Sequence, residues 1–388
     1  MKFIQMLVVV LLSSACAPKV AIQVLEPSHV TAPNHIQTVA FVDRSRVDGA
    51  GEMVLGAIEG LLTGEAIGAD NSGRDEAEKG FREVFGETPR FDLVLPGDVN
   101  VDGGFFDKNM NWKVARRLCK SAGCQGIVAL ESFDSDSVVK TKMKKREKQN
   151  EAGKKVYEKY WVAERRTNVN TSWRFYDIKN KVVIDDLKGW SNANTFRYEG
   201  RTEDAAVSQL PSQRRTIDNQ GYAAGVDYAR RVAPFYVTVY RTIYTRGDPN
   251  LKASKDYVKT ENWKEANAYW AKAAMSDKAK IRGRALYNMA VSKEVDGDLD
   301  GALALAEESN TQYPKGVTGD YAQMIRQRIW KKQKVEESLE AANRSEEDPA
   351  DEVDSVEEES DSEEVDEDVK VRPSEDQDDQ EVKVRPAE

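Results

Sequence analysis

Apolar and polar positions along the first half of the chain follow the periods of strands and helices in turn. Short apolar runs that predict buried strands lie at 36–43, 91–95 and 126–130. Segments with helical spacing of apolar residues lie between them, at 51–67, 74–85 and 112–119. This succession predicts an α/β layer in which helices pack on a sheet.

The pattern changes in the middle of the chain. Residues 160–177 and 181–190 are rich in Val, Thr, Tyr and Trp, and Ile178 to Asn180 between them predict a hairpin turn. We therefore expect an antiparallel addition to the sheet. A helix follows at 213–232, in which Gly221 and Gly225 lie one turn apart and would allow close backbone packing, and a last strand is expected at 235–244.

A basic stretch precedes this hairpin. Its cationic residues are Lys140, Lys142, Lys144, Lys145, Arg146, Lys148, Lys154 and Lys155. They could bind anionic lipid headgroups or the acidic end of the same chain. The alternative is a solvated hairpin extension or loop with no binding role.

The region after residue 248 predicts paired helices in repeats. Leu286, Gly297, Ala302 and Pro314 have the spacing of a tetratricopeptide repeat, and a looser copy lies 36 residues upstream. We expect two repeats and a capping helix from Asp320 to about Lys334. The inner faces of the first helices would line a groove for an extended peptide, and the candidate lining residues are Lys255, Lys259, Tyr287 and Glu294.

The N-terminal sequence predicts where in the cell the protein is located. Lys2, the apolar run 3–12 and the small residues before Cys16 resemble the signal peptide and lipobox of a bacterial lipoprotein, with acylation at Cys16. Ordinary cleavage after Ala17 is the competing interpretation, although Pro18 would be a poor residue after the cut. The residues directly after Cys16 include no aspartate, so we expect the periplasm-facing leaflet of the outer membrane.

Charge divides the chain sharply. Residues 336–388 contain 24 acidic and 5 basic residues, whereas the rest of the chain is net positive. Such a segment cannot bury enough apolar surface to order itself, so we expect a disordered tail that binds divalent cations loosely. A seven-residue sequence beginning at Val369 recurs at Val382 and could be a short linear ligand, or simple drift in a low-complexity tail.

Few residues suited to metal binding or acid–base catalysis are present. The two histidines, His29 and His35, lie near no cysteine or carboxylate cluster in the sequence, so we expect no metal, cofactor or catalytic histidine. Cys119 and Cys124 could form a local disulfide in an oxidising compartment, or remain buried thiols. We expect no nucleic-acid partner, because the signal takes the chain out of the cytoplasm.

Several motifs together resemble one known family. They are the lipobox, Leu25 to Pro27, Val42 to Ser45, Ala233 with Pro234, and Trp263 with Trp270. In these the chain resembles Bacteroidota lipoproteins classed as domain of unknown function 6340, over about residues 16–334. The resemblance implies this architecture and an envelope location, and it carries no active-site residue.

The sequence therefore predicts an α+β protein, with a signal peptide at 1–15 and a leader at 16–35. A mixed α/β sheet domain with an antiparallel hairpin is expected at 36–248, a tetratricopeptide-like helical domain at 249–335 and the acidic tail at 336–388. The function expected is a lipid-anchored, non-enzymatic scaffold whose repeats bind an unidentified protein.

Two alternatives remain open at this point. One is an enzyme or enzyme subunit acting on envelope polymers, with Glu131, Asp134 and Asp136 as the first acid and base candidates. The other is a carrier of a hydrophobic ligand, which would need a large apolar cavity between the sheet and the helix at 213–232.

Overall fold

Five strands in the order β3, β2, β4, β5, β6 form the main sheet of the computed structural model, which describes residues 18–45, 69–96, 108–151 and 153–347. The strands are β2 (Thr38–Asp43), β3 (Asp92–Val94), β4 (Gly126–Gln149), β5 (Lys155–Asp177) and β6 (Val182–Gly200). β2 pairs in parallel with β3 and β4, whereas β5 pairs antiparallel with β4 and β6. The predicted mixed sheet with an antiparallel hairpin is confirmed.

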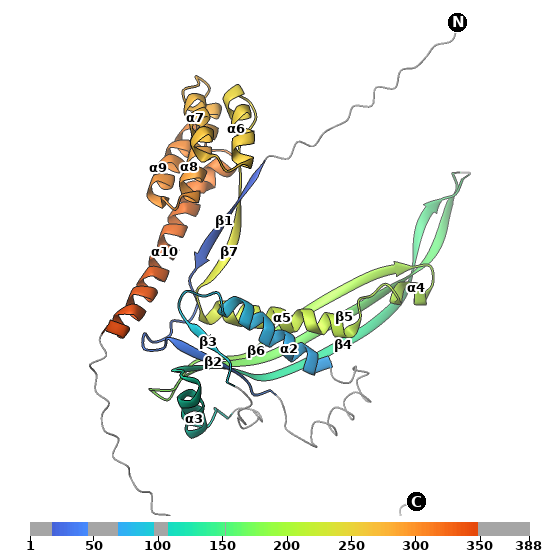
Figure 1. Cartoon of the computed structure of the whole chain (residues 1–388). Helices are drawn as coiled ribbons and strands as arrows, with labels where there is room; N and C mark the ends of the chain where they lie inside the picture. The colour runs from blue at the N-terminus through green and yellow to red at the C-terminus, as the bar shows by residue number, and fades with distance from the viewer. Residues whose placement is uncertain (1–17, 46–68, 97–107, 152, 348–388) are drawn as a thin grey trace, which may run out of the picture. The chain divides into compact units, whose positions relative to one another are not determined.

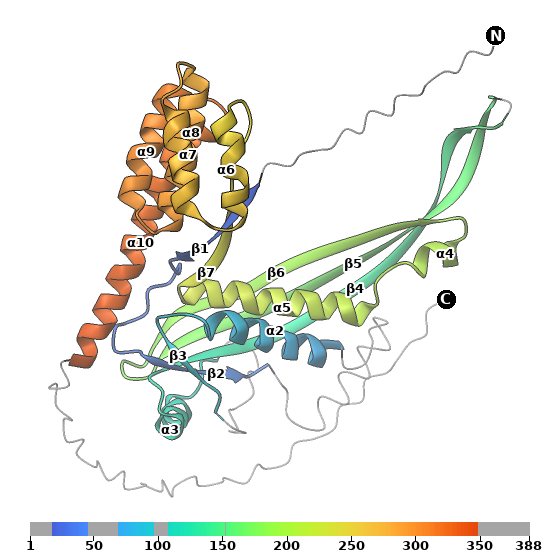
Figure 2. The same ribbon diagram turned by 45° about the horizontal axis from the view of Figure 1, so that its top comes forward.

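Helices cover the two faces of this sheet unequally. α2 (Ala69–Phe85) and α5 (Gln213–Val232) lie side by side over one face, and α3 (Trp112–Ala122) packs on the other face near β2 and β4 (Figures 1 and 2). The short helix α4 (Glu203–Val207) packs further along, against β5 and β6. The predicted helix at 51–67 lies outside the described residues.

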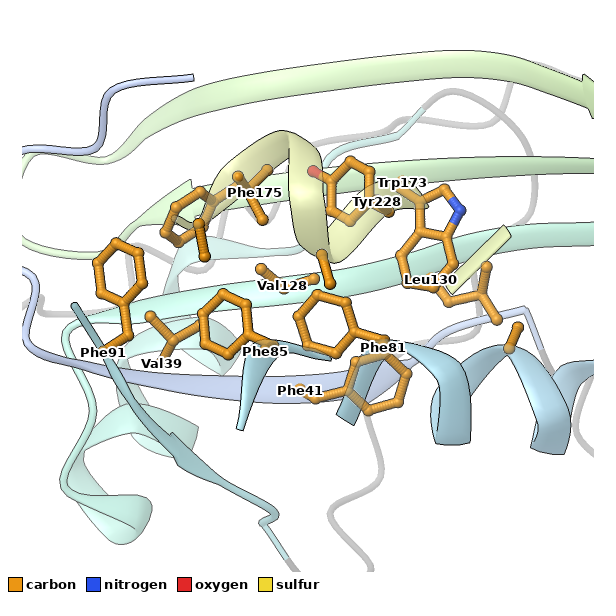
Figure 3. Close-up of a cluster of buried hydrophobic side chains, with 14 of the residues drawn as sticks. Val39, Phe41, Phe81, Phe85, Phe91, Val128, Leu130, Trp173, Phe175 and Tyr228 are labelled. Atoms are coloured by element: carbon orange, nitrogen blue, oxygen red, sulfur yellow. The ribbon is translucent and has the colours of Figure 1, made fainter. Parts of the chain in front are cut away.

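An aromatic core joins α2 and α5 to the sheet (Figure 3). Trp173 of β5 stacks on Tyr228 of α5 with 4.8 Å between ring centroids, and Phe81 of α2 lies 5.9 Å from the same Trp173 ring. All three side chains are at most 1% exposed. Burying aromatic side chains of this size is a main source of stability for the layer.

Glycines let α2 and α5 approach closely, as predicted for Gly221 and Gly225. A Cβ at Gly225 would lie 1.9 Å from the carbonyl oxygen of Ala77, and one at Gly221 would lie 2.2 Å from that of Gly73. The atoms in the way belong to the α2 backbone, which cannot move aside as a flexible side chain can. The absence of Cβ atoms therefore sets the distance between the two helices.

The basic stretch is part of a long hairpin and not a loop. β4 and β5 pair without interruption from Ser132 with Ser172 to Gln149 with Lys155, so β4 extends far beyond the predicted strand at 126–130. Charged residues occupy both faces of this extension and hide the alternating pattern that identifies a half-buried strand. At 138–149 and 155–161 no side chain is buried, so the backbone ladder, rather than burial, holds this distal part of the hairpin together.

A series of five helices follows the sheet region, as expected. They are α6 (Pro249–Lys259), α7 (Trp263–Ala274), α8 (Ala279–Val295), α9 (Leu299–Gln312) and α10 (Val317–Glu347). Ala266, Trp270 and Ala302 are all fully buried between them. No helix within the described ranges is long and apolar enough to cross a membrane.

Helix α10 is longer than the predicted capping helix and runs past the boundary placed at residue 335. Val335 and Ala342 are each 3% exposed, and the side chain of Gln37 donates a hydrogen bond of 3.0 Å to the carbonyl oxygen of Ala342. These contacts give the polar segment 336–347 apolar burial that its composition does not reveal.

We expect Gly225→Ala to lower the free energy of unfolding by about 3 kcal/mol, because the added methyl group meets the α2 backbone. The matched control is Gly319→Ala in α10, where the nearest atom to a new Cβ is 3.7 Å away. That change should be neutral or stabilise by up to about 1 kcal/mol. Urea unfolding of both variants measures the difference, and equal midpoints would contradict the close approach of α2 and α5.

Candidate functional site

The inner face of the helical series holds an extended segment of the chain itself. Strands β1 (Lys19–Glu26) and β7 (Phe235–Thr242) pair antiparallel to form a two-stranded sheet, which we call the β1–β7 ribbon. Val20, Ile22 and Val24 on one side of the ribbon are buried in the same apolar cluster as residues of α6 to α10. The predicted groove is therefore occupied from within.

Asn288 of α8 holds the backbone just after β7. Its side-chain oxygen accepts a hydrogen bond of 2.9 Å from the amide of Tyr244, and its side-chain nitrogen donates one of 2.7 Å to the Tyr244 carbonyl. Asn288 is fully buried. The Asn288 amide thus pairs with both the N–H and the C=O of Tyr244, as a neighbouring strand would.

A buried carboxylate fastens the ribbon to two helices. Glu294 of α8 accepts two hydrogen bonds of 2.8 Å from the Arg241 guanidinium of β7 and one of 2.5 Å from the Tyr321 hydroxyl of α10. Arg328 of α10 also donates to it. Burial alone would raise the pKa of Glu294, but the hydrogen bonds from Arg241, Tyr321 and Arg328 outweigh burial and lower that pKa.

Two of the four predicted groove residues are in the wrong environment for ligand binding. Tyr287 is 2% exposed and packs 4.7 Å from the Tyr321 ring, and Glu294 is 1% exposed in the network just described. Lys259 is exposed and pairs with Asp256 at 2.9 Å, while Lys255 is half-buried. Tyr287 and Glu294 are covered by Tyr244, by Arg241 of the ribbon and by Tyr321 of α10, so the structure does not leave them free to line a groove.

The acidic cluster proposed for the enzyme alternative is divided by burial. Glu131 is 7% exposed and accepts hydrogen bonds of 2.5 Å from both Arg44 and the Tyr176 hydroxyl. Burial and the adjacent Glu131 raise the pKa of Tyr176 to about 12. Asp134 and Asp136 lie further along β4 and are exposed. The arrangement places one carboxylate in an ion-pair network and two in solvent.

Side chains fill the space that a hydrophobic carrier would need. Between the sheet and α5, Ile217, Tyr228 and Val232 pack against Trp173 and Phe175 of β5, all at most 1% exposed. An open surface hollow of about 710 Å³ lies elsewhere, lined by charged and polar residues of α2 and by residues around β3. Its charged lining, which includes Lys79, Arg82 and Glu83, differs from the enclosed apolar lining of a lipid site.

Cys119, Cys124 and His35 each contact another side chain of the chain. Cys119 and Cys124 form a disulfide across the end of α3, with their Cα atoms 4.5 Å apart. His35 contacts the buried Asp177 at 3.0 Å through its Nε2 atom. The described residues contain no group of three or more His, Cys, Asp or Glu side chains placed to hold a metal ion. Cys16 and the acidic segment after Glu347 lie outside the described residues.

Comparison with protein families divides the chain at the same place as the fold does. Residues 36–244, the sheet region through β7, match the domain of unknown function DUF8603. The chain belongs to the DUF8603 family. Residues 252–340 match a second domain of unknown function, DUF6340. The resemblance to family 6340 is thus confirmed for the helical series, but its predicted extent over 16–334 was too broad. No curated protein matches the chain.

The matched ranges show what sequence reasoning missed. Arg241 lies in the DUF8603 region and Glu294 in the DUF6340 region, so the buried ion pair joins the two families' segments. A signal for it was present, because Asn288 and Glu294 are polar residues on a helix that is otherwise buried almost all round. Such residues require partners, and the sequence offered no way to identify them.

We expect Glu294→Ala to lower the free energy of unfolding of the helical series by about 3–5 kcal/mol, since the buried Arg241 and the partly buried Arg328 would be left without a counter-charge. Lys293→Ala is the control on the neighbouring position, because Lys293 pairs with Asp298 in solvent. That change should cost less than about 1 kcal/mol. Chemical denaturation followed by tryptophan fluorescence measures both, and a loss from Glu294→Ala no larger than from the control would contradict the assignment.

The lowered pKa of Glu294 also predicts a pH dependence. A carboxyl group whose pKa is lower in the folded state stabilises the fold above its unfolded value of about 4.3, and this stability is lost as pH falls through the folded pKa. Thermal unfolding midpoints measured from pH 7 to pH 3 should fall more steeply for the natural chain than for Glu294→Gln. Parallel curves would show that this group does not titrate as inferred.

Proposed function

We propose that the protein is a lipid-anchored scaffold of the cell envelope, attached through Cys16 to the outer membrane and facing the periplasm, that binds a partner protein. In this proposal α6 to α9 are two tetratricopeptide-like repeats, since Ala266 and Ala302 occupy equivalent buried positions one repeat apart. The filled inner face argues that the partner binds elsewhere than in the groove expected from the sequence.

The observation that supports a partner surface is the outward side of the β1–β7 ribbon. Tyr236 is 46% exposed and Tyr240 is 64% exposed, and both point away from the side of the ribbon that packs on the helices. Their cross-strand neighbours are Leu25 and Ala21. Tyrosines on a rigid support lose little conformational entropy on binding and are enriched in protein interfaces.

The ribbon is a rigid support because its other side is fixed. Arg241 lies on that side, next in sequence to Tyr240, and is held by Glu294. Successive residues of a strand point to opposite faces, so the ion pair and the exposed tyrosines are two sides of one element. The partner would meet a preformed surface.

The test is crosslinking with a photoreactive residue at position 238, between the two tyrosines, in membranes from cells that make the full chain. We expect one dominant envelope protein to be crosslinked, and Tyr236→Ser with Tyr240→Ser to reduce its yield at least tenfold. The matched control is Lys255→Ala with Lys259→Ala on the helix first expected to line the groove, and this variant should keep the crosslink.

Loss of the crosslink in the lysine variant alone would move the partner to α6. No crosslinked protein from this position in any variant would overturn the proposed surface. Retained membrane attachment after Cys16→Ser, measured by fractionation, would overturn the proposed anchor independently of the partner.

A further inference from the structure

The distal part of the β4–β5 hairpin carries a concentration of positive charge that the fold does not use. We define the basic ribbon as residues 140–149 and 155–166, which pair with one another in β4 and β5. These segments contain ten basic and three acidic residues. In Figure 1 this end of the hairpin projects beyond β6 and the helices that cover the sheet.

The few acidic residues of the basic ribbon neutralise only a few of its cations. Arg146 pairs with Glu158 at 2.9 Å, and Lys155 pairs with Glu147 at 2.8 Å. Within the described part of the chain, Lys142, Lys144 and Lys148 form no ion pair with an acidic side chain, although Lys148 is close enough to Glu158 to contribute to lowering its pKa. They share one face with Arg146, because alternate residues of a strand point the same way.

Apolar groups accompany these cations at the tip of the hairpin. Tyr157 is 72% exposed, Val156 is 39% exposed and Met143 is 45% exposed. A strand of ten residues is about 33 Å long, so the charges are spread along a thin two-sided element. Cations interleaved with an exposed aromatic ring and aliphatic groups match the boundary between anionic headgroups and hydrocarbon.

We propose that the basic ribbon binds an anionic lipid surface. Lysines near such a surface are attracted by its negative potential. Val156 lies opposite Lys148 on the face of these lysines and Tyr157 lies on the other face, so the thin tip would enter the headgroup region with apolar groups on both sides. A basic patch is a common second attachment for a lipid-anchored protein. The inference draws its physiological setting from the proposed envelope location, but binding by the basic ribbon itself does not require the anchor.

The test uses the chain beginning at Ala17, which keeps every described residue and carries no acyl group. Its binding is measured by sedimentation with vesicles of phosphatidylcholine containing 30% phosphatidylglycerol, and with vesicles of phosphatidylcholine alone. We expect binding to the anionic vesicles only. The affinity should fall at least tenfold between 0.05 M and 0.5 M salt, because the Debye length shortens over this range.

The decisive variant combines Lys142→Glu, Lys144→Glu and Lys148→Glu. Their cross-strand neighbours are Val162, Tyr160 and Val156, so the reversed charges create no direct like-charge pair within the hairpin. The control is Lys252→Glu with Lys264→Glu and Lys280→Glu, which makes the same change in net charge at exposed sites of the helical series. We expect at least tenfold weaker binding for the first variant and less than a threefold change for the second.

Equal effects of the two triple variants would overturn the proposal, since net charge alone would then explain the binding. Tighter binding of the natural chain to poly-glutamate than to anionic vesicles would also overturn it and assign the basic ribbon to an acidic polypeptide. Because the anchor is absent from this experiment, its failure leaves the proposed attachment through Cys16 to be judged by membrane fractionation.

Discussion

The buried carboxylate of Glu294 is the constraint on which the second half of this protein depends. A charged group in an apolar interior is tolerated only when strong donors surround it, and here the donors come from β7 and α10. Arg241 is far in sequence from Tyr321 and Arg328 of α10, so the network forms only when the β1–β7 ribbon and α10 are both in place. The requirement selects one arrangement of these elements.

The same principle operates in the sheet region, around Glu131. Arg44 follows β2, Tyr176 lies near the end of β5, and both donate to this carboxylate at a point where the β4 ladder is irregular. Each half of the chain therefore contains a buried acid that brings distant segments together. Charged residues that stand out in a sequence can have a structural role of this kind. For this reason the acidic residues at 131–136 could be taken for catalytic candidates.

Much of the fold could be predicted because local periodicity reports burial directly. The helix at 213–232 was predicted with the bounds found for α5, and the close approach at Gly221 and Gly225 followed from their spacing. The groove at Tyr287 could not be evaluated in the same way. The side chains that cover it, Tyr244 and Tyr321, come from segments before and after α8, and helical periodicity shows that a face is apolar without showing what covers it.

A hairpin extension was one of the structures considered for the basic stretch, but its strands could not be identified from the side-chain pattern. Residues 138–149 and 155–161 have no buried side chain, so backbone pairing orders them and leaves no apolar alternation in the sequence. Conversely, the polar composition after residue 335 suggested the loss of structure, yet Val335 and Ala342 find partners and the helix continues. Composition describes average tendencies, and a few buried contacts can override it.

The position of β1 determines how close the structure lies to Cys16, the proposed site of lipid attachment. The carbonyl oxygen of Pro18 accepts a hydrogen bond of 2.9 Å from the amide of Ile243, so this pairing begins two residues after Cys16. Two Cα steps span about 7 Å at most. In the proposed anchored form, acyl chains on Cys16 would therefore hold the β1–β7 ribbon close to the bilayer surface, and a partner of its exposed tyrosines would have to meet them there.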